Sequence, residues 1–268
     1  MMESIKPPRF NKYWPGQKND SAENEPIGWL RRMGGLLLVV VILFKLGTLA
    51  RLSGTEQETL PGGTRAIHIR FQDCPVNCLP VNWQARDHQY AAKVYSVQQE
   101  SGCKFIRADS RKTQDPIGYE VRWPLRDFPI LQWRWRAVQF PAGSNERELG
   151  RNDSVLGVYV VFGHFPLIKS IKYIWSDTLP EGSCFPSPHS AMTQVVVVRS
   201  GRGQRGAWVT ESRDVLADYV QFYGGKEKNP VALGIGLLTD SDNTRSQAIG
   251  DYAEFRTLPP ETMPAANP

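Results

Sequence analysis

Oxygen-bearing side chains gather in the segment Thr239-Asp-Ser-Asp-Asn-Thr244. Asp240, Asp242 and Asn243 offer the hard oxygen ligands that calcium prefers, and Asp251 follows in the next predicted strand. The segment lacks the glycine and the terminal glutamate of an EF-hand loop. Short Asp-Asn segments also commonly form turns that bond their own backbone. The sequence therefore leaves two interpretations open, a structural Ca²⁺ site and a plain turn, and it suggests no other cofactor.

Charged residues also cluster where a strand is expected to lead into a helix, at Glu211, Arg213, Asp214 and Asp218. Two carboxylates can share acid and base work in glycan cleavage, so Glu211 or Asp240, each with a nearby basic residue, would be the catalytic candidates. The alternative is that Asp214 caps the helix while Glu211 pairs with a basic residue. No Gly-x-Ser-x-Gly segment is present and the four histidines are far apart in sequence. The sequence thus leans away from an enzyme.

Basic side chains alternate with large apolar ones in three predicted strands. Every second residue of Leu131–Val138 is apolar, which sends Arg134 and Arg136 to the opposite face. Arg122 and Lys172 take the same kind of position in two other strands. If these strands share one sheet, the four basic residues form a ligand-binding patch, because arginine pairs bidentately with carboxylate or phosphate. An ordinary solvated outer face is the favoured interpretation of these residues, and the functional hypothesis beside it is a face that binds an anionic polysaccharide.

A glycine-rich segment, Gly201-Arg-Gly-Gln-Arg-Gly206, matches the spacing of a dinucleotide-binding loop. That chemistry needs a helix directly after the glycines, whose first amides hold the pyrophosphate. The following residues, Ala207–Glu211, instead have the pattern of a strand. The sequence therefore predicts a glycine-rich hairpin and no nucleotide cofactor.

The elements that must position these residues are mostly strands. Eight Trp, eleven Phe and nine Tyr in 268 residues favour β-structure, and short apolar runs are bounded by Gly, Pro, Asn and Ser. The predicted strands are 66–71, 90–98, 104–108, 118–123, 130–140, 154–162, 171–176, 193–199, 207–211, 232–239 and 249–256. One helix is predicted at Asp214–Tyr223, ended by Gly224. So many strands favour two packed sheets, an all-β, jelly-roll-like antiparallel sandwich.

A single hydrophobic segment, Met33–Ala50, precedes this domain and carries one charge, Lys45. Its length just suffices to cross a bilayer, and Arg31 and Arg32 before it place the N-terminus in the cytoplasm. The expected organisation is a cytoplasmic tail (1–32), a transmembrane signal-anchor (33–50), a linker (51–64), the sandwich (65–257) and a tail (258–268). The domain then faces the periplasm from the inner membrane. A signal peptide cleaved near Thr48–Ala50 is the alternative.

Charge and cysteines narrow the partners. The formal charge is +5, but the basic residues are spread along the chain, so no nucleic-acid partner is expected. Four cysteines suit an exported protein: Cys74 and Cys78 could close a small loop, and Cys103 and Cys184 could pair across the fold. Their spacing does not match a zinc site.

Several short segments, taken together, carry a resemblance to a known family. They are Trp83, 127–136, Pro141 with Glu146, 158–162, 169–175, 195–201, 208–215 with Asp218 and Tyr219, and 238–244. In this order they resemble the bacterial domain of unknown function family 3047. The resemblance implies an exported bacterial domain with a strand pattern like the jelly rolls of carbohydrate-binding modules, and it supplies no catalytic residues.

The sequence thus predicts a membrane-anchored, extracytoplasmic β-sandwich that binds anionic polysaccharide or another envelope component without catalysis. A glycan hydrolase or lyase on the same scaffold is the first alternative. A structural partner in an envelope protein complex is the second.

Overall fold

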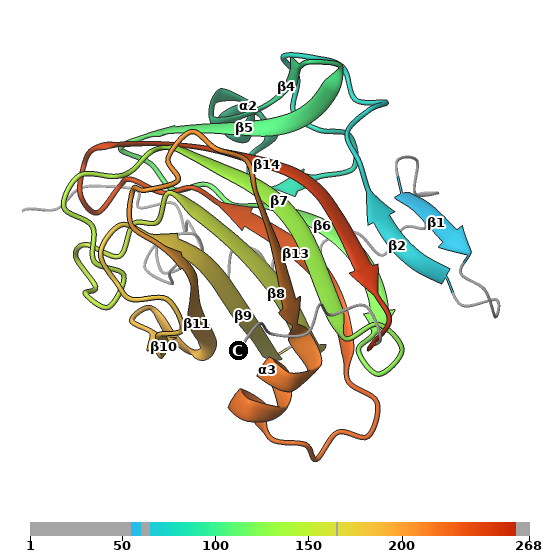
Figure 1. Cartoon of the computed structure of the whole chain (residues 1–268). Helices are drawn as coiled ribbons and strands as arrows, with labels where there is room; N and C mark the ends of the chain where they lie inside the picture. Colours follow the sequence, from blue (N-terminus) through green and yellow to red (C-terminus); the bar gives the residue numbers. More distant parts are fainter. Residues whose placement is uncertain (1–54, 60–64, 165, 261–268) are drawn as a thin grey trace, which may run out of the picture. The chain divides into compact units, whose positions relative to one another are not determined.

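The computed structural model describes residues 55–59, 65–164 and 166–260 (Figure 1). Within these residues the chain forms two seven-stranded sheets and two short helices. The predicted anchor Met33–Ala50 and the tail before it lie outside the described residues. No helix in the described ranges is long and apolar enough to cross a membrane.

Sheet A is antiparallel and is organised around its longest strand. Its strands are β1 (Thr55–Thr59), β2 (Arg65–Ile69), β4 (Tyr95–Glu100), β5 (Cys103–Arg111), β7 (Ile130–Gln139), β12 (Val209–Asp214) and β14 (Gln247–Leu258). One edge of β14 pairs with β7, and its other edge pairs first with β5 and then with β2. The strand β12 lies beyond β7. The central strand therefore changes partner along one edge, which shapes the site described below.

Sheet B is mixed. Its order is β10 (Cys184–Ser187), β11 (Ser190–Ser200), β9 (Leu167–Ser176), β8 (Leu156–His164), β13 (Val231–Leu238), β6 (Ile117–Pro124) and β3 (Gln84–Ala85). β9 and β11 run parallel, so the expectation of a purely antiparallel sandwich is wrong at this pair. The cause is β10, which pairs antiparallel with β11 and reverses the chain between β9 and β11.

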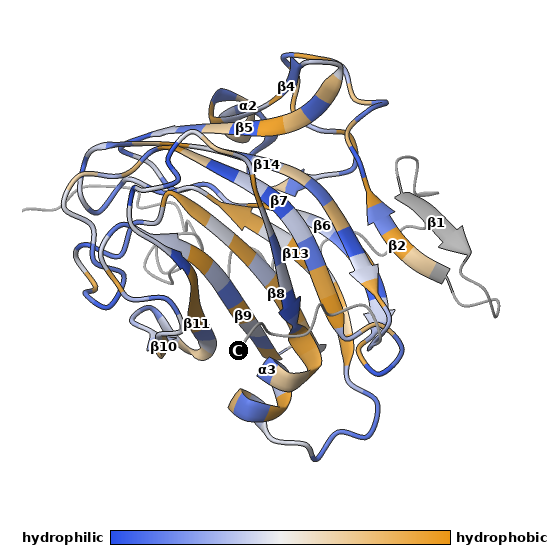
Figure 2. Cartoon of the chain, viewed as in Figure 1, coloured by the Kyte–Doolittle hydropathy of each residue, from blue (hydrophilic) through white to orange (hydrophobic). Residues whose placement is uncertain are grey.

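The core lies between the two sheets and is filled by rings. Leu131, Trp133, Trp135 and Ala137 are all fully buried, as the alternating pattern predicts. Trp175 of sheet B packs against Trp135, with ring centroids 6.0 Å apart. Hydrophobic and hydrophilic residues alternate along β7 (Figure 2). Burial of such large side chains is the main contribution to the stability of a sandwich.

The predicted helix is confirmed as α3 (Val215–Tyr223). Asp214 is its N-cap and accepts a hydrogen bond from the Ala217 amide at 2.8 Å. The helix ends at Gly224, which takes a positive φ of 77°. Its Tyr219 packs edge-on against Phe162 of sheet B, with ring centroids 5.0 Å apart.

A second helix, α2 (His88–Val94), replaces the first half of the strand predicted over 90–98. Asp87 caps it by accepting from the Tyr90 amide at 3.0 Å. The strand β4 begins only at Tyr95. The expectation of one helix is thus wrong, because the N-cap and the adjacent alanines outweigh the β-preference of Tyr90 and Val94.

The glycine-rich segment is not a hairpin, contrary to the sequence-based expectation. β11 belongs to sheet B and β12 to sheet A, so residues 201–208 connect the two sheets. Gly201 and Gly206 take positive φ values of 73° and 81°, which glycine adopts without strain. A strand follows, as predicted, and not the helix that a dinucleotide loop requires. All four cysteines are free thiols in the structure.

Candidate functional site

A shallow pocket of about 40 Å³ opens on the outer face of sheet A, at a bulge in β14. β14 pairs with β5 as far as Tyr252 and with β2 from Phe255 onward, so neither strand pairs with Ala253 or Glu254. The register with β7 shifts at the same place. Glu254 takes a φ of 48°, an uncommon backbone conformation for a residue with a side chain. Bulges and strained residues of this kind are enriched near functional sites.

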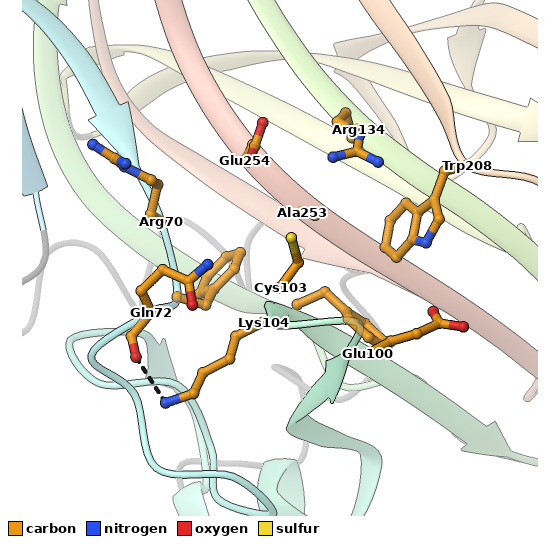
Figure 3. Close-up of a pocket in the computed structure, with 11 residues that line it drawn as sticks. Arg70, Gln72, Glu100, Cys103, Lys104, Arg134, Trp208, Ala253 and Glu254 are labelled. Carbon is orange, nitrogen blue, oxygen red and sulfur yellow. Dashed lines mark hydrogen bonds between the residues drawn. The ribbon is translucent and has the colours of Figure 1, made fainter.

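We call this the arginine pocket, after two arginines that line it together with a lysine, two acidic side chains and an indole. These residues are Arg70, Lys104, Arg134, Glu100, Glu254 and Trp208 (Figure 3). Arg134 and Trp208 lie side by side at one end, and Arg70 lies at the other (Figure 3). The pocket thus combines a flat apolar surface with cationic groups, the combination that binds an anionic ring.

Two arginines stack on Trp208. The guanidinium of Arg134 lies 5.4 Å from the ring centroid, and that of Arg136 lies 4.6 Å away. Trp208 also meets the Phe105 ring edge-on at 5.2 Å. Stacking of this kind contributes about 0.5–1 kcal/mol at exposed sites and orients the guanidinium planes.

The two arginines differ in their ion pairs. Arg136 forms salt bridges to Asp251 at 2.7 Å and to Glu100 at 2.8 Å, and Asp251 also pairs with Arg107. Arg134 forms no ion pair within the described part of the chain. Arg136 is therefore neutralised by carboxylates of the protein, whereas Arg134 has no such partner among the described residues.

The sequence-predicted basic patch is not a single surface. Arg134 and Arg136 lie on β7 in sheet A, while Arg122 lies on β6 and Lys172 on β9, both in sheet B. Arg122 is exposed and Lys172 is buried, with 6% of its surface accessible. The premise that all three strands share one sheet is wrong: β6 and β9 lie in sheet B, but β7 lies in sheet A. The alternating pattern is the same in each strand and does not determine which strands it pairs with.

Lys172 is the centre of a polar cluster on the outer face of sheet B. Its Nζ donates to the Ser154 hydroxyl at 3.2 Å and lies 5.5 Å from the Tyr159 ring centroid. Burial lowers the pKa of Lys172, but Asp240, Tyr159 and Glu146 together outweigh that effect and leave the pKa above its ordinary value. Burial raises the pKa of Asp240 to about 7, although Lys172 opposes the shift. The adjoining cavity of about 20 Å³ has room for one water molecule or ion. Asp240 therefore has the basic neighbour that the hydrolase or lyase alternative requires.

A group of three carboxylates adjoins Lys172 and could hold a metal ion. Asp153, Asp240 and Asp242 each place an oxygen within 4.8 Å of the others. Asp240 accepts from the Ser154 amide at 2.7 Å, so one of its oxygens is already oriented. A side-chain oxygen of Asp242 and one of Asn243 are buried without a hydrogen-bond partner. These donors fit a hard cation such as Ca²⁺.

The membership of this acidic group differs from the sequence-based prediction. Asp240, Asp242 and Asn243 lie together as predicted, but Asp251 does not join them, because it is held by two arginines in sheet A. Asp153 takes the place of Asp251 in the acidic group, and the sequence did not predict it. Asp153 accepts from the Thr244 amide at 2.7 Å, across a sequence separation of 91 residues. No local pattern predicts a contact over that distance.

Glu211 is engaged on both carboxylate oxygens. Oε1 accepts from Arg199 at 2.9 Å and from the Trp135 indole at 3.1 Å, and Oε2 accepts from Arg199 at 3.1 Å. Burial raises the pKa of Glu211, while Arg199 opposes the rise. Asp218 similarly pairs with Arg213 at 2.7 Å. Asp214 thus caps the helix and Glu211 pairs with a basic residue, Arg199, which are the contacts that the structural interpretation of this cluster predicts.

Comparison with known proteins identifies a family and some distant structures. A family model described as "Protein of unknown function (DUF3047)" matches residues 81–256. No curated protein matches the chain. Among solved structures, endoglucanase 3 of Trichoderma harzianum, from family GH12, is similar with 9% identity and a TM-score of 0.37, covering 79% of this chain and 99% of that one.

Two further structures are similar at the same low level. The xyloglucanase domain of NopAA from Sinorhizobium fredii has 6% identity and a TM-score of 0.34, covering 78% of this chain and 94% of its own. The glycoside hydrolase domain of Endo-D from Streptococcus pneumoniae R6 has 9% identity and a TM-score of 0.34. The similarity covers 68% of this chain and only 22% of that longer chain.

Proposed function

The chain belongs to the family described as protein of unknown function (DUF3047), and we propose that it is a binding protein whose arginine pocket takes an anionic glycan. The observation that carries the proposal is the pairing of Arg134 with Trp208. Arg134 stacks on the indole and forms no ion pair in the described part of the chain. A sugar ring can lie against the indole face while its carboxylate meets the guanidinium.

The surrounding residues support a glycan with one anionic group on each ring over a glycan with several anionic groups on each ring. Arg136 is paired with carboxylates and so fixes Trp208 without adding a free charge. Glu254 brings a negative charge into the pocket, which disfavours closely spaced anionic groups but can accept hydrogen bonds from sugar hydroxyls. A bidentate arginine to carboxylate contact contributes about 1.5–3 kcal/mol. A polyuronate, with one carboxylate per ring, matches this arrangement.

The proposal keeps the location that the sequence predicts. Met33–Ala50 anchors the chain in the inner membrane, and the domain faces the periplasm, where envelope glycans are within reach. Protease added to spheroplasts should then degrade the domain while the cells stay intact. Protection of the domain from that protease would contradict this location.

The test is binding of oligogalacturonate and of a neutral cello-oligosaccharide to the full chain, measured by calorimetry. We expect the acidic glycan to bind more tightly, with an affinity that falls as NaCl is raised from about 20 mM to about 300 mM. Arg134→Ala should weaken binding by roughly 10-fold or more. Arg122→Ala removes the same charge from an exposed position on sheet B and is the matched control. Equal losses from both variants, or no binding at low salt across a panel of polyuronates, would refute the proposal.

A further inference from the structure

An aromatic cavity of about 190 Å³ lies next to the arginine pocket. Its apolar lining consists of Ile69, Phe71, Cys74, Val81, Trp83 and Tyr119. The rings form a connected group, with centroids 6.1 Å apart for Phe71 and Trp83 and 5.5 Å apart for Trp83 and Tyr119. An apolar cavity of about 150 Å³ suffices to bind benzene. This cavity therefore has room for one ring or a short branched alkyl group, and not for a long acyl chain.

The cavity and the arginine pocket are neighbours that share lining residues. Arg70 and Phe71, which follow directly after β2, line both. Arg70 and Asp73 are exposed, and Val81 keeps 47% of its surface accessible, so the cavity can be reached from solvent. A molecule seated in the arginine pocket thus lies beside Arg70 and Phe71, which also border the cavity.

The segment over the cavity is held in place by bonds to the rest of the domain. The Lys104 ammonium, which belongs to the arginine pocket, donates to the backbone carbonyls of Gln72 and Cys74 at 2.7 Å each. The Cys74 amide in turn donates to the Phe71 carbonyl at 3.0 Å. Lys104 therefore bonds to one lining residue of each pocket, Gln72 of the arginine pocket and Cys74 of the aromatic cavity.

We infer that the ligand is amphipathic: an anionic sugar in the arginine pocket carries a compact, ring-sized apolar aglycone that fills the aromatic cavity. The inference rests on the proposed function and specifies its ligand. The occupant follows from the residues that the two pockets share, from the aromatic lining and from the cavity volume. The anionic part supplies the salt-dependent contact with Arg134, and the aglycone supplies buried apolar area.

The test compares three ligands with the full chain by calorimetry: glucuronic acid, phenyl glucuronide and phenyl glucoside. We expect phenyl glucuronide to bind roughly 10-fold more tightly than glucuronic acid, because only it fills the cavity. Phenyl glucoside should bind more weakly than phenyl glucuronide, because it lacks the carboxylate. Binding of the two phenyl glycosides with equal affinity would overturn the inference.

Variants separate the two pockets. Val81→Phe narrows the cavity at an exposed position. This variant should bind phenyl glucuronide no more tightly than glucuronic acid, and its affinity for glucuronic acid should equal that of wild type. Val81→Ala is the matched control that keeps the cavity open and should keep the gain. Arg134→Ala should weaken the binding of glucuronic acid and of phenyl glucuronide by the same factor.

The two possible failures are distinguishable. If glucuronic acid binds in an Arg134-dependent way but the phenyl group adds nothing, the inference is overturned and the proposed function stands. If neither acid binds, the proposed function fails and the inference fails with it. Xenon in a pressurised crystal provides a second readout: density beside Trp83 is expected, and its absence would overturn the inference of an accessible cavity.

Discussion

The buried carboxyl group of Asp240 gives the fold a pH dependence that one substitution should remove. Burial raises the pKa of Asp240 from 3.8 to about 7, against the effect of Lys172. A raised acid pKa means that the folded state holds the proton more tightly than the unfolded state does. The Asp240 contribution to stability is therefore largest below about pH 4 and is lost as pH rises towards 7. At about 1.36 kcal/mol per pKa unit, this rise corresponds to about 4 kcal/mol of unfolding free energy.

Asp240→Asn isolates this effect, because the amide oxygen can still accept the 2.7 Å hydrogen bond from Ser154. We expect the variant and the wild type to agree within about 1 kcal/mol near pH 4, and the variant to be more stable by up to about 4 kcal/mol near pH 8. Urea unfolding across this range, with EDTA to remove divalent cations, gives the comparison. Glu148→Gln, at a half-exposed surface carboxylate, controls for the lost charge. Parallel pH profiles for Asp240→Asn and wild type would refute the reasoning.

Three further outcomes follow from the packing and the charges. Gly250→Ala should lower the unfolding free energy by about 1–3 kcal/mol, because the new Cβ would lie 2.5 Å from the Leu156 side chain. Gly203→Ala is the control: it has open space around it and should lower the unfolding free energy far less in the same urea titration. Glu211→Gln weakens a largely buried ion pair and should lower the unfolding free energy by about 1–3 kcal/mol; a variant of unchanged stability that stopped degrading a polysaccharide cleaved by wild type would instead favour the enzyme alternative. If the acidic group holds Ca²⁺, millimolar CaCl₂ should raise the melting temperature of wild type but not of Asp242→Asn; no calcium-dependent shift in wild type would contradict the predicted structural Ca²⁺.

Features that depend on neighbouring residues could be predicted from the sequence. The alternation in Leu131–Val138 predicts which side chains of β7 enter the core, because a strand sends successive residues to opposite faces. The Asp214 cap and Gly224 stop define α3 in the same local way. The strong β-preference of Tyr90 and Val94 concealed α2, whose cap at Asp87 was the available signal.

Features that depend on strand pairing could not be predicted. Arg134 and Lys172 occupy equivalent positions in their strands, yet one pairs into sheet A and the other into sheet B. The arginine pocket needs the bulge at Glu254 and the change of partner along β14, which no short pattern encodes. Asp153 joins the acidic group only because its loop and the loop after β13 meet in the folded chain. Candidate residues were therefore predictable one at a time, but their grouping into sites was not.

The most direct test of the arginine pocket is to follow the indole N–H resonances while oligogalacturonate is added. The Trp208 signal is identified as the one that disappears in Trp208→Phe. We predict that this signal moves in a saturable way, that it moves less at high salt, and that it no longer responds in Arg134→Ala. An unmoved Trp208 signal at saturating glycan, or an equal response in Arg134→Ala, would contradict the claim that this pocket binds the glycan.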